Sequence, residues 1–186
     1  MTAFAVNPVL SAVYAALVPF IQQVTGLPPA QVVLGLGNRT PMPAPGFIAV
    51  QAITRHRLRT NLHSGVTIAE DESGSVTMEE GVELTVQIDC YSTPVSATQP
   101  QSAEDWATML STTLRDAYGC SIFPPNIQPL FADDARMIPL VAGEEQYEER
   151  WSLEAHFQYN PQTTVPQQYA DVLDLELIDV PNLTPQ

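Results

Sequence analysis

The sequence predicts an α+β fold, with a small, mostly antiparallel sheet flanked by two helices. Two segments, 82–91 and 151–159, alternate strictly between apolar and polar residues, which is typical of strands with one buried face. Two others, 10–24 and 106–117, carry apolar residues at helical spacing. The strands come in runs joined by connections of hairpin length, and this favours antiparallel pairing over alternating parallel units.

The first helix is expected between Asn7 and Gly26. Asn7 is a suitable N-cap, and Pro8 falls in the first turn, where a missing N–H costs nothing. Pro19 is expected to kink or restart the helix, because its ring opposes the carbonyl one turn earlier. A short buried strand is predicted next, at 32–36.

A long strand is predicted at 47–60, after a segment (37–46) whose prolines exclude helix and central strand. The Gly-, Ser- and acid-rich segment 64–80 is predicted to be a mobile hairpin arm or loop, with its tip at 70–74. The alternating strand 82–91 follows it.

The second helix is predicted to begin at a capping box variant, in which Ser102 is followed by Asp105, and to end at Gly119. Residues 123–134 are expected to be irregular, and 137–142 to form a short extended piece.

The alternating strand 151–159 is broken by Asn160 and Pro161. The proline-containing pieces around Pro161 and Pro166 are interpreted as arms that cannot complete a sheet, and 172–180 as a strand or extended arm. Residues 1–186 are expected to form one domain, with the arm near 64–80 and an extended C-terminal arm near 181–186.

Charge excludes two classes of partner. The chain has 186 residues and a formal net charge of −14, and all seven basic residues are Arg. Groove-reading nucleic-acid binding needs phosphate-neutralising cations, and docking on anionic lipid needs them too. Only 15% of residues are charged, so much of the surface is neutral and polar, as is common where a partner covers it.

Neither a secretion signal nor a disulfide framework is predicted. The apolar run 3–21 has no preceding Arg and no small-residue cleavage site, and prolines interrupt it. Cys90 and Cys120 are most simply two small buried apolar residues, although a single bridge between them stays open. A soluble protein made in a reducing cytoplasm is expected.

The sequence shows no catalytic constellation, and no cofactor or metal is predicted. His56, His63 and His156 lack metal-ligand spacing with each other or with the cysteines. No phosphate-binding glycine loop or nucleophile elbow is present. The adjacent carboxylates 133–134 and 144–145 are typical of a solvated face.

Arg55, Arg57 and Arg59 share one face of the predicted strand 47–60, since side chains alternate by two. One interpretation pairs them with carboxylates of their own chain. Another pairs them with acidic segments of a neighbouring copy, because Arg binds carboxylates bidentately at interfaces. A phosphate contact is the weakest interpretation at this net charge. The candidates for a subunit interface are Arg55, Arg57, Arg59, Glu144, Glu145, Glu148 and Glu149, with the acidic segment 70–72 as a further partner.

Several phrases, in a shared order from about Val32 to Val180, resemble the neck or tail terminator proteins of contractile-tailed phages. The most specific are Gly-Glu-Glu-Gln-Tyr at 143–147 and Gln-Tyr-Asn-Pro at 158–161. Shorter matches lie at 38–43, 57–61, 87–91 and 114–116, and at 164–171. The first helix and the acidic insert 70–80 do not take part.

The resemblance implies a virion structural protein, located in the tail or neck, and not an enzyme. Such proteins form a ring, usually a homohexamer, that caps the tail tube and sheath and joins them to the head-side connector. DNA passes through the lumen, where an acidic wall would repel phosphate. A closed ring repeats one heterologous interface, which an Arg face and an acidic segment could supply. Two alternatives are a virion hydrolase with an undetected site and an assembly adaptor that leaves the particle.

Overall fold

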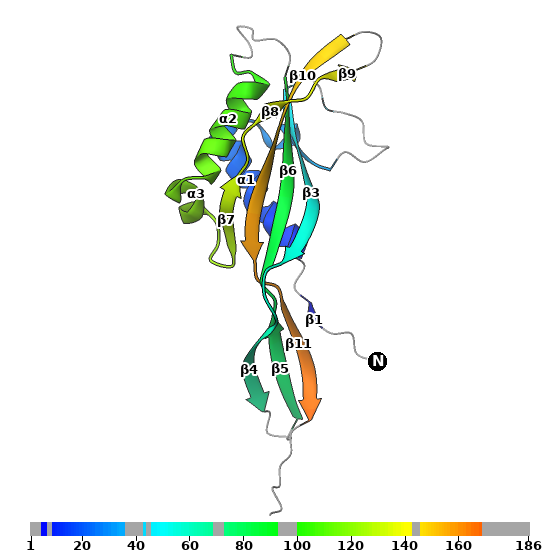
Figure 1. The fold of residues 1–186 in the computed structure, drawn as a ribbon, viewed down its shortest axis with the longest axis vertical. Coiled ribbons are helices and arrows are strands. Elements are labelled where there is room, and N and C mark those ends of the chain that lie inside the picture. Colours follow the sequence, from blue (N-terminus) through cyan, green and yellow to red (C-terminus); the bar gives the residue numbers. More distant parts are fainter. Residues whose placement is uncertain are drawn as a thin grey trace, which may run out of the picture.

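The structure is a computed structural model, and it describes residues 5–6, 9–35, 43, 46–68, 73–92, 100–142 and 146–168. Two β-sheets lie end to end, and helices cover one face of the larger sheet (Figure 1). This arrangement confirms the predicted α+β class. We call the larger sheet with its helices the body, and the smaller sheet the arm.

The sheet of the body has seven strands in the order β2-β3-β6-β10-β7, with β8 and β9 also paired to β10. Its strands are β2 (Val32–Leu34), β3 (Phe47–Arg57), β6 (Val82–Ser92), β7 (Ile127–Ala132), β8 (Arg136–Met137), β9 (Leu140–Ala142) and β10 (Gln146–Tyr159). The β2–β3 pair is parallel, and the other pairings in this sheet are antiparallel. The two alternating segments of the sequence became its central strands, β6 and β10.

The helices are α1 (Val9–Thr25), α2 (Ala103–Leu114) and α3 (Ala117–Ile122), and a 3-10 turn, η1, spans Pro29–Gln31. Their apolar stripes pack on the face of the sheet that alternation had assigned to the core. The fully buried side chains of this interface include Leu17, Phe20, Ile21, Leu110, Leu114, Val86, Ile88, Leu153 and Phe157. Ser102 caps α2 through the predicted capping box with Asp105.

The arm is a four-stranded sheet that extends the body at one end (Figure 1). Its strands, in spatial order, are β1 (Ala5–Val6), β11 (Gln162–Gln168), β5 (Ser73–Glu79) and β4 (Leu62–Ile68). The segment 64–80, predicted to be a mobile hairpin arm or loop, contains most of the antiparallel β4–β5 pair. Among the described residues, the chain crosses between arm and body at 58–61, 80–81 and 160–161; we call this junction the waist.

Three predictions about the second half of the chain were wrong. Within 123–134, predicted to be irregular throughout, residues 127–132 form β7, which pairs with β10 across a register shift. The second helix ends at Leu114, and Asp116 caps the separate helix α3, in which Gly119 is buried. The segment around Pro166 does complete a sheet: β11 pairs with β5 along its length.

The first half differs in smaller ways. Helix α1 continues through Pro19 as one element. Strand β3 ends at Arg57, short of residue 60, and β2 ends at Leu34, which is exposed. Cys120 is exposed and not buried as expected, whereas Cys90 is buried, and both thiols are free.

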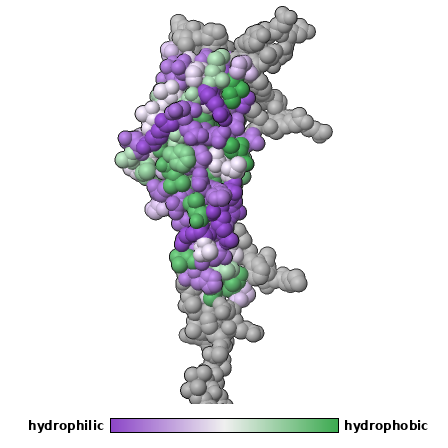
Figure 2. Space-filling view, viewed as in Figure 1, coloured by the Kyte–Doolittle hydropathy of each residue, from purple (hydrophilic) through white to green (hydrophobic). Residues whose placement is uncertain are grey.

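Some expectations fall outside the described residues. These are the Asn7 cap with Pro8, the arm tip at 70–72, the carboxylates Glu144 and Glu145, and the C-terminal arm beyond 168. In the described part of the chain, no helix combines the length and apolar character needed to cross a membrane. Figure 2 shows a largely hydrophilic surface with hydrophobic side chains in separate patches.

Candidate assembly surface at the waist and the outer sheet face

Three arginines hold the waist together through ion pairs with two adjacent glutamates. Arg55 Nη2 lies 2.7 Å from Glu80 Oε2, and Arg57 Nε lies 2.9 Å from Glu80 Oε1. Arg59 Nη2 lies 2.5 Å from Glu79 Oε1. Each oxygen of Glu80 therefore takes its own guanidinium group, and we call this set of five side chains the waist clamp.

The clamp forms because strand pairing brings the arginines at the end of β3 next to the glutamates that precede β6. Antiparallel pairing sets Arg57 of β3 opposite Val82 of β6, so that the chain just before β6 runs beside the chain just after β3. The N–H of Leu58 donates to the carbonyl of Gly81 at 2.9 Å, and the N–H of Glu80 donates to that of Pro161 at 3.0 Å. These three described crossings are thus hydrogen-bonded to one another.

Solvent still reaches the arginines of the clamp. The side chains of Arg55 and Arg57 are 52% and 55% exposed, and that of Arg59 is 40% exposed. Ion pairs with such exposure contribute about 0–1 kcal/mol each to folding. Each guanidinium has donors beyond those that hold the glutamates, so the clamp keeps binding capacity on its outer side.

The acidic interface candidates lie elsewhere. Glu149 sits at the end of β10 away from the waist, opposite Ser92. Its carboxylate accepts hydrogen bonds from the Ser92 hydroxyl at 3.1 Å and from Trp151 Nε1 at 2.9 Å. Nothing is described of the Glu148 side chain, nor of residues 144 and 145. The structure therefore does not bring Glu149 together with the arginines of the same subunit.

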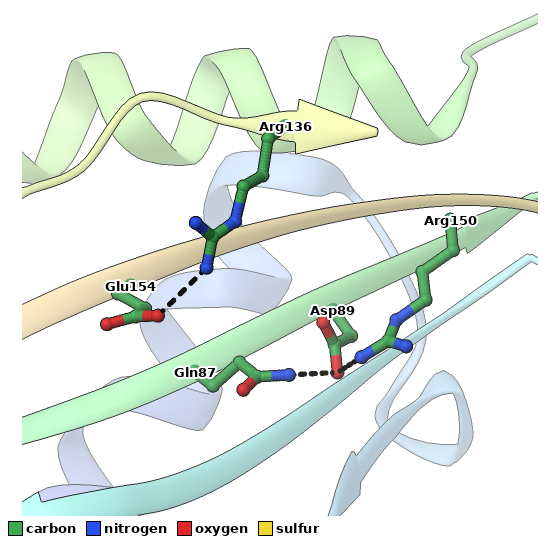
Figure 3. A network of polar contacts seen from close by, with 5 residues as sticks. All are labelled: Gln87, Asp89, Arg136, Arg150 and Glu154. Atoms are coloured by element: carbon green, nitrogen blue, oxygen red, sulfur yellow. Dashed lines mark hydrogen bonds and ion pairs between the residues drawn. The ribbon is translucent and has the colours of Figure 1, made fainter. Parts of the chain in front are cut away.

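A buried ion pair lies on the outer face of the sheet, opposite the helices (Figure 3). Asp89 Oδ2 lies 2.9 Å from Arg150 Nη2 and accepts a second hydrogen bond, of 2.8 Å, from Gln87 Nε2. The Arg150 guanidinium lies 5.8 Å from the centre of the Tyr91 ring, which stacks on Phe47 at 4.5 Å.

The environment of this pair keeps Arg150 charged. Burial lowers the pKa of Arg150, but the hydrogen bond and negative charge of Asp89, together with Tyr91, outweigh it and leave the pKa raised. Asp89 Oδ1 and Arg150 Nε are buried and have no hydrogen-bond partner among the described residues. Both residues are held by β6 and β10, the two central strands, so the pair is fixed in place.

A second polar cluster lies on the same face, nearer the β7 edge. His156 Nδ1 is 2.7 Å from Glu83 Oε1, and the His156 ring stacks on Phe131 at 4.0 Å. Glu154 pairs with Arg136 at 3.2 Å (Figure 3). Asp133, Glu154 and His156 bring potential metal-ligating atoms within 4.8 Å of one another.

The sequence pattern contained only part of this geometry. It placed the three arginines on one face, but it missed Glu79 and Glu80, the carboxylates that hold them. These glutamates could have been found from the predicted strands 47–60 and 82–91. Antiparallel alignment of the two strands would set residue 80 beside residue 57. The sequence pattern indicated a solvated face for Asp133 and did not place it beside β10, because the segment that positions this residue was interpreted as irregular.

Of the two thiols, one is a packing residue. Burial, and then the charge of Asp89, raise the pKa of the Cys90 thiol far above its usual range, which keeps it protonated and unreactive. Cys120 is exposed, and its Sγ donates to the carbonyl of Pro129 at 3.8 Å.

Comparison with known proteins identifies the family of this chain. The family described as phage neck terminator protein matches residues 11–184, a span that includes α1 from its third residue, the other helices, the body sheet and the β4–β5–β11 part of the arm. No curated protein matches the chain.

Proposed function

This chain belongs to the phage neck terminator family, and on that premise we propose that it closes the tail as a ring of identical subunits. As a member of that family it is a structural protein of the virion neck and contacts other head or tail proteins. The proposed ring is hexameric, caps the tube and sheath of a contractile tail, joins them to the head-side connector, and surrounds the DNA channel.

The shape of the subunit carries this proposal. A closed ring uses one heterologous interface, in which a surface of each subunit meets a different surface of the next. The arm projects from one end of the body (Figure 1). The two ends of the subunit therefore differ, and one end can meet the opposite end of a neighbour. Because backbone hydrogen bonds and the waist clamp tie the arm to the body, we propose that the whole chain, 1–186, acts as one domain.

We further propose that the clamp contributes to the subunit interface. Arg55, Arg57 and Arg59 hold glutamates of their own chain and remain 40–55% exposed. One guanidinium presents five N–H donors and can hold two carboxylates at once. The partners would be acidic residues of the next subunit: Glu148 and Glu149, at the end of β10 away from the waist, and Glu144 and Glu145, which precede β10 in the sequence. Head-to-tail contact would then bring opposite charges together at each junction.

The net charge fits a channel through which DNA must pass without being held. With 21 acidic and 7 basic residues, a wall built from this protein repels phosphate and releases no counterions from DNA. The protein therefore suits a position around the duplex and does not suit sequence reading.

Native mass spectrometry of the purified protein, alone and mixed with tail tubes, tests the ring. We expect a single closed assembly, with six copies as the main species in the presence of tubes. A chain that stays monomeric under both conditions would refute the ring. Mass spectrometry of purified virions separates a neck component from an assembly adaptor, because only the former persists in the particle at a few copies.

A further inference from the structure

Three metal-ligating side chains meet on the outer face of the body sheet, apart from the waist clamp. Glu154 and His156 are two residues apart on β10 and so point to the same side of the sheet. Asp133 directly follows β7, and its N–H donates to the carbonyl of Glu154 at 2.8 Å. The potential ligand atoms of Asp133, Glu154 and His156 all lie within 4.8 Å of one another.

We propose that these three side chains form a binding site for a divalent transition-metal ion of the zinc class. For three atoms that lie within 4.8 Å of one another, there is a point no more than about 2.8 Å from any of them, and zinc ligands sit at ~2.0–2.2 Å. Shifts of under about 1 Å, within the reach of side-chain rotation, complete the coordination. One imidazole nitrogen with two carboxylates suits Zn²⁺ better than Mg²⁺ or Ca²⁺, which prefer oxygen ligands alone.

The surroundings of His156 support this assignment. Its Nδ1 lies 2.7 Å from Glu83 Oε1 and 3.3 Å from Thr85 Oγ1, which leaves Nε2 as the nitrogen for the ion. Metal-bound histidines commonly donate their other N–H to a carboxylate, which fixes the ring and raises its basicity. The Phe131 ring stacks on the face of the imidazole, with centroids 4.0 Å apart and an interplanar angle of 15°, and so restricts its orientation.

The negative charge of the cluster also favours a bound cation. The site holds two carboxylates, and Arg136 Nη2 lies 3.2 Å from Glu154 Oε1. Arg136 is 68% exposed, so its side chain can leave Glu154 when an ion arrives. The ion would join the end of β7 to β10, and three protein ligands leave a further position for water.

Isothermal titration of the full-length protein with ZnCl₂, and with MgCl₂ and CaCl₂ in parallel, tests the site. We expect one Zn²⁺ per chain with a rise in melting temperature, and weaker binding of the other two ions. Asp133→Asn and His156→Ala should each abolish the zinc response. Glu83→Ala should lower zinc affinity about 10–100-fold, as loss of a partner to a metal-bound histidine does.

Matched controls separate this site from adventitious binding. The other accessible soft ligands are His56, His63 and Cys120, each exposed, and His63→Ala and Cys120→Ser should leave the titration unchanged. Asp134→Asn, next to the site, should also leave it unchanged. Absence of zinc binding, tighter binding of Ca²⁺ than of Zn²⁺, or an unchanged titration in Asp133→Asn would each overturn the proposal. Circular dichroism establishes that every variant is folded.

Discussion

Arg59 lies directly over Gly81: its Nε is 2.7 Å from the position that a β-carbon on residue 81 would occupy. The Arg59 side chain reaches Glu79 across this glycine, so the waist clamp depends on a residue without a side chain. Gly81 is not one of the glycines with positive φ, and its backbone therefore accepts alanine. A side chain on residue 81 would meet Arg59, and no backbone strain opposes it.

Gly81→Ala should therefore act through Arg59. In the wild-type chain the new methyl group displaces Arg59, and loss of its exposed ion pair with Glu79 offsets the gain from a stiffer unfolded chain. In an Arg59→Ala background the same change should stabilise the fold by about 0.4–1 kcal/mol. Chemical denaturation of the four proteins measures this difference. An equal effect of Gly81→Ala in both backgrounds would contradict the contact.

Reversal of one charge in the clamp tests whether it acts between subunits. Arg57→Glu breaks a half-exposed ion pair with Glu80, so the subunit should lose less than about 1 kcal/mol. If the clamp also holds a neighbour, assembly should weaken by about 2–5 kcal/mol. Native mass spectrometry and thermal denaturation give the two quantities separately.

Arg136→Glu is the matched control, because Arg136 is also an exposed arginine paired with a partly buried glutamate. It lies on β8 and not at the waist, so its reversal should leave assembly unchanged. Should Arg57→Glu destabilise the isolated subunit as much as it weakens the assembly, the clamp would serve only its own chain.

The Asp89–Arg150 pair should behave as a buried ion pair. Their side chains are 9% and 21% exposed, and Arg150→Met leaves the Asp89 carboxylate with the Gln87 amide alone. We expect a loss of about 3–5 kcal/mol in unfolding free energy. Asp89→Asn in the same background should recover part of it, because it removes the unpaired charge. A double variant whose loss equals the sum of the single losses would rule out this coupling.

The cap of α2 gives a prediction for acid pH. Hydrogen bonds from the Ser102 backbone N–H and then from its hydroxyl lower the pKa of Asp105 below its usual value of 3.8. A depressed folded-state pKa stabilises the protein above the unfolded value, and this contribution is lost as pH falls through the folded value. Asp105→Asn should therefore flatten the decline in melting temperature below about pH 4.

Ser102→Ala removes the other half of the capping box. It should cost about 0.5–2 kcal/mol at neutral pH, because the Asp105 N–H loses its acceptor. Thr112→Ala, at an exposed position of the same helix, controls for a general change in helix stability. A melting temperature unaffected by Ser102→Ala would mean that the cap is dispensable.

The sequence predicted the parts of the fold whose periodicity is unbroken. Strands β6 and β10 were found because one face of each packs on helices and the other faces outward. Strand β7 was missed because Pro129 lies within it and the β10 register shifts between His156 and Phe157, which breaks the alternation.

Prolines also misled the interpretation of β11. Pro166 pairs with Ser75 of β5 on one side, while β1 reaches only Thr163 and Thr164 on the other. At Pro166 no described strand lies along that second edge, so the missing N–H does not interrupt a ladder. An isolated sequence does not reveal which edge of a strand will remain unpaired.

The candidate sites could be predicted only in part, because they depend on contacts between segments that are distant in the sequence. Alternation correctly put Glu154 and His156 on one face of a strand, as it did Arg55 and Arg57. The partners of these residues, Asp133 and Glu80, depend on how neighbouring strands align, and that alignment is fixed only by the whole sheet.

A three-dimensional reconstruction of the virion neck tests the central claim most directly. The account predicts a closed ring of this chain between the tail tube and the head-side connector. Its subunits should meet head to tail, with the waist clamp of one facing the acidic end of β10 in the next. Neck density that accommodates no ring of this fold would contradict the account.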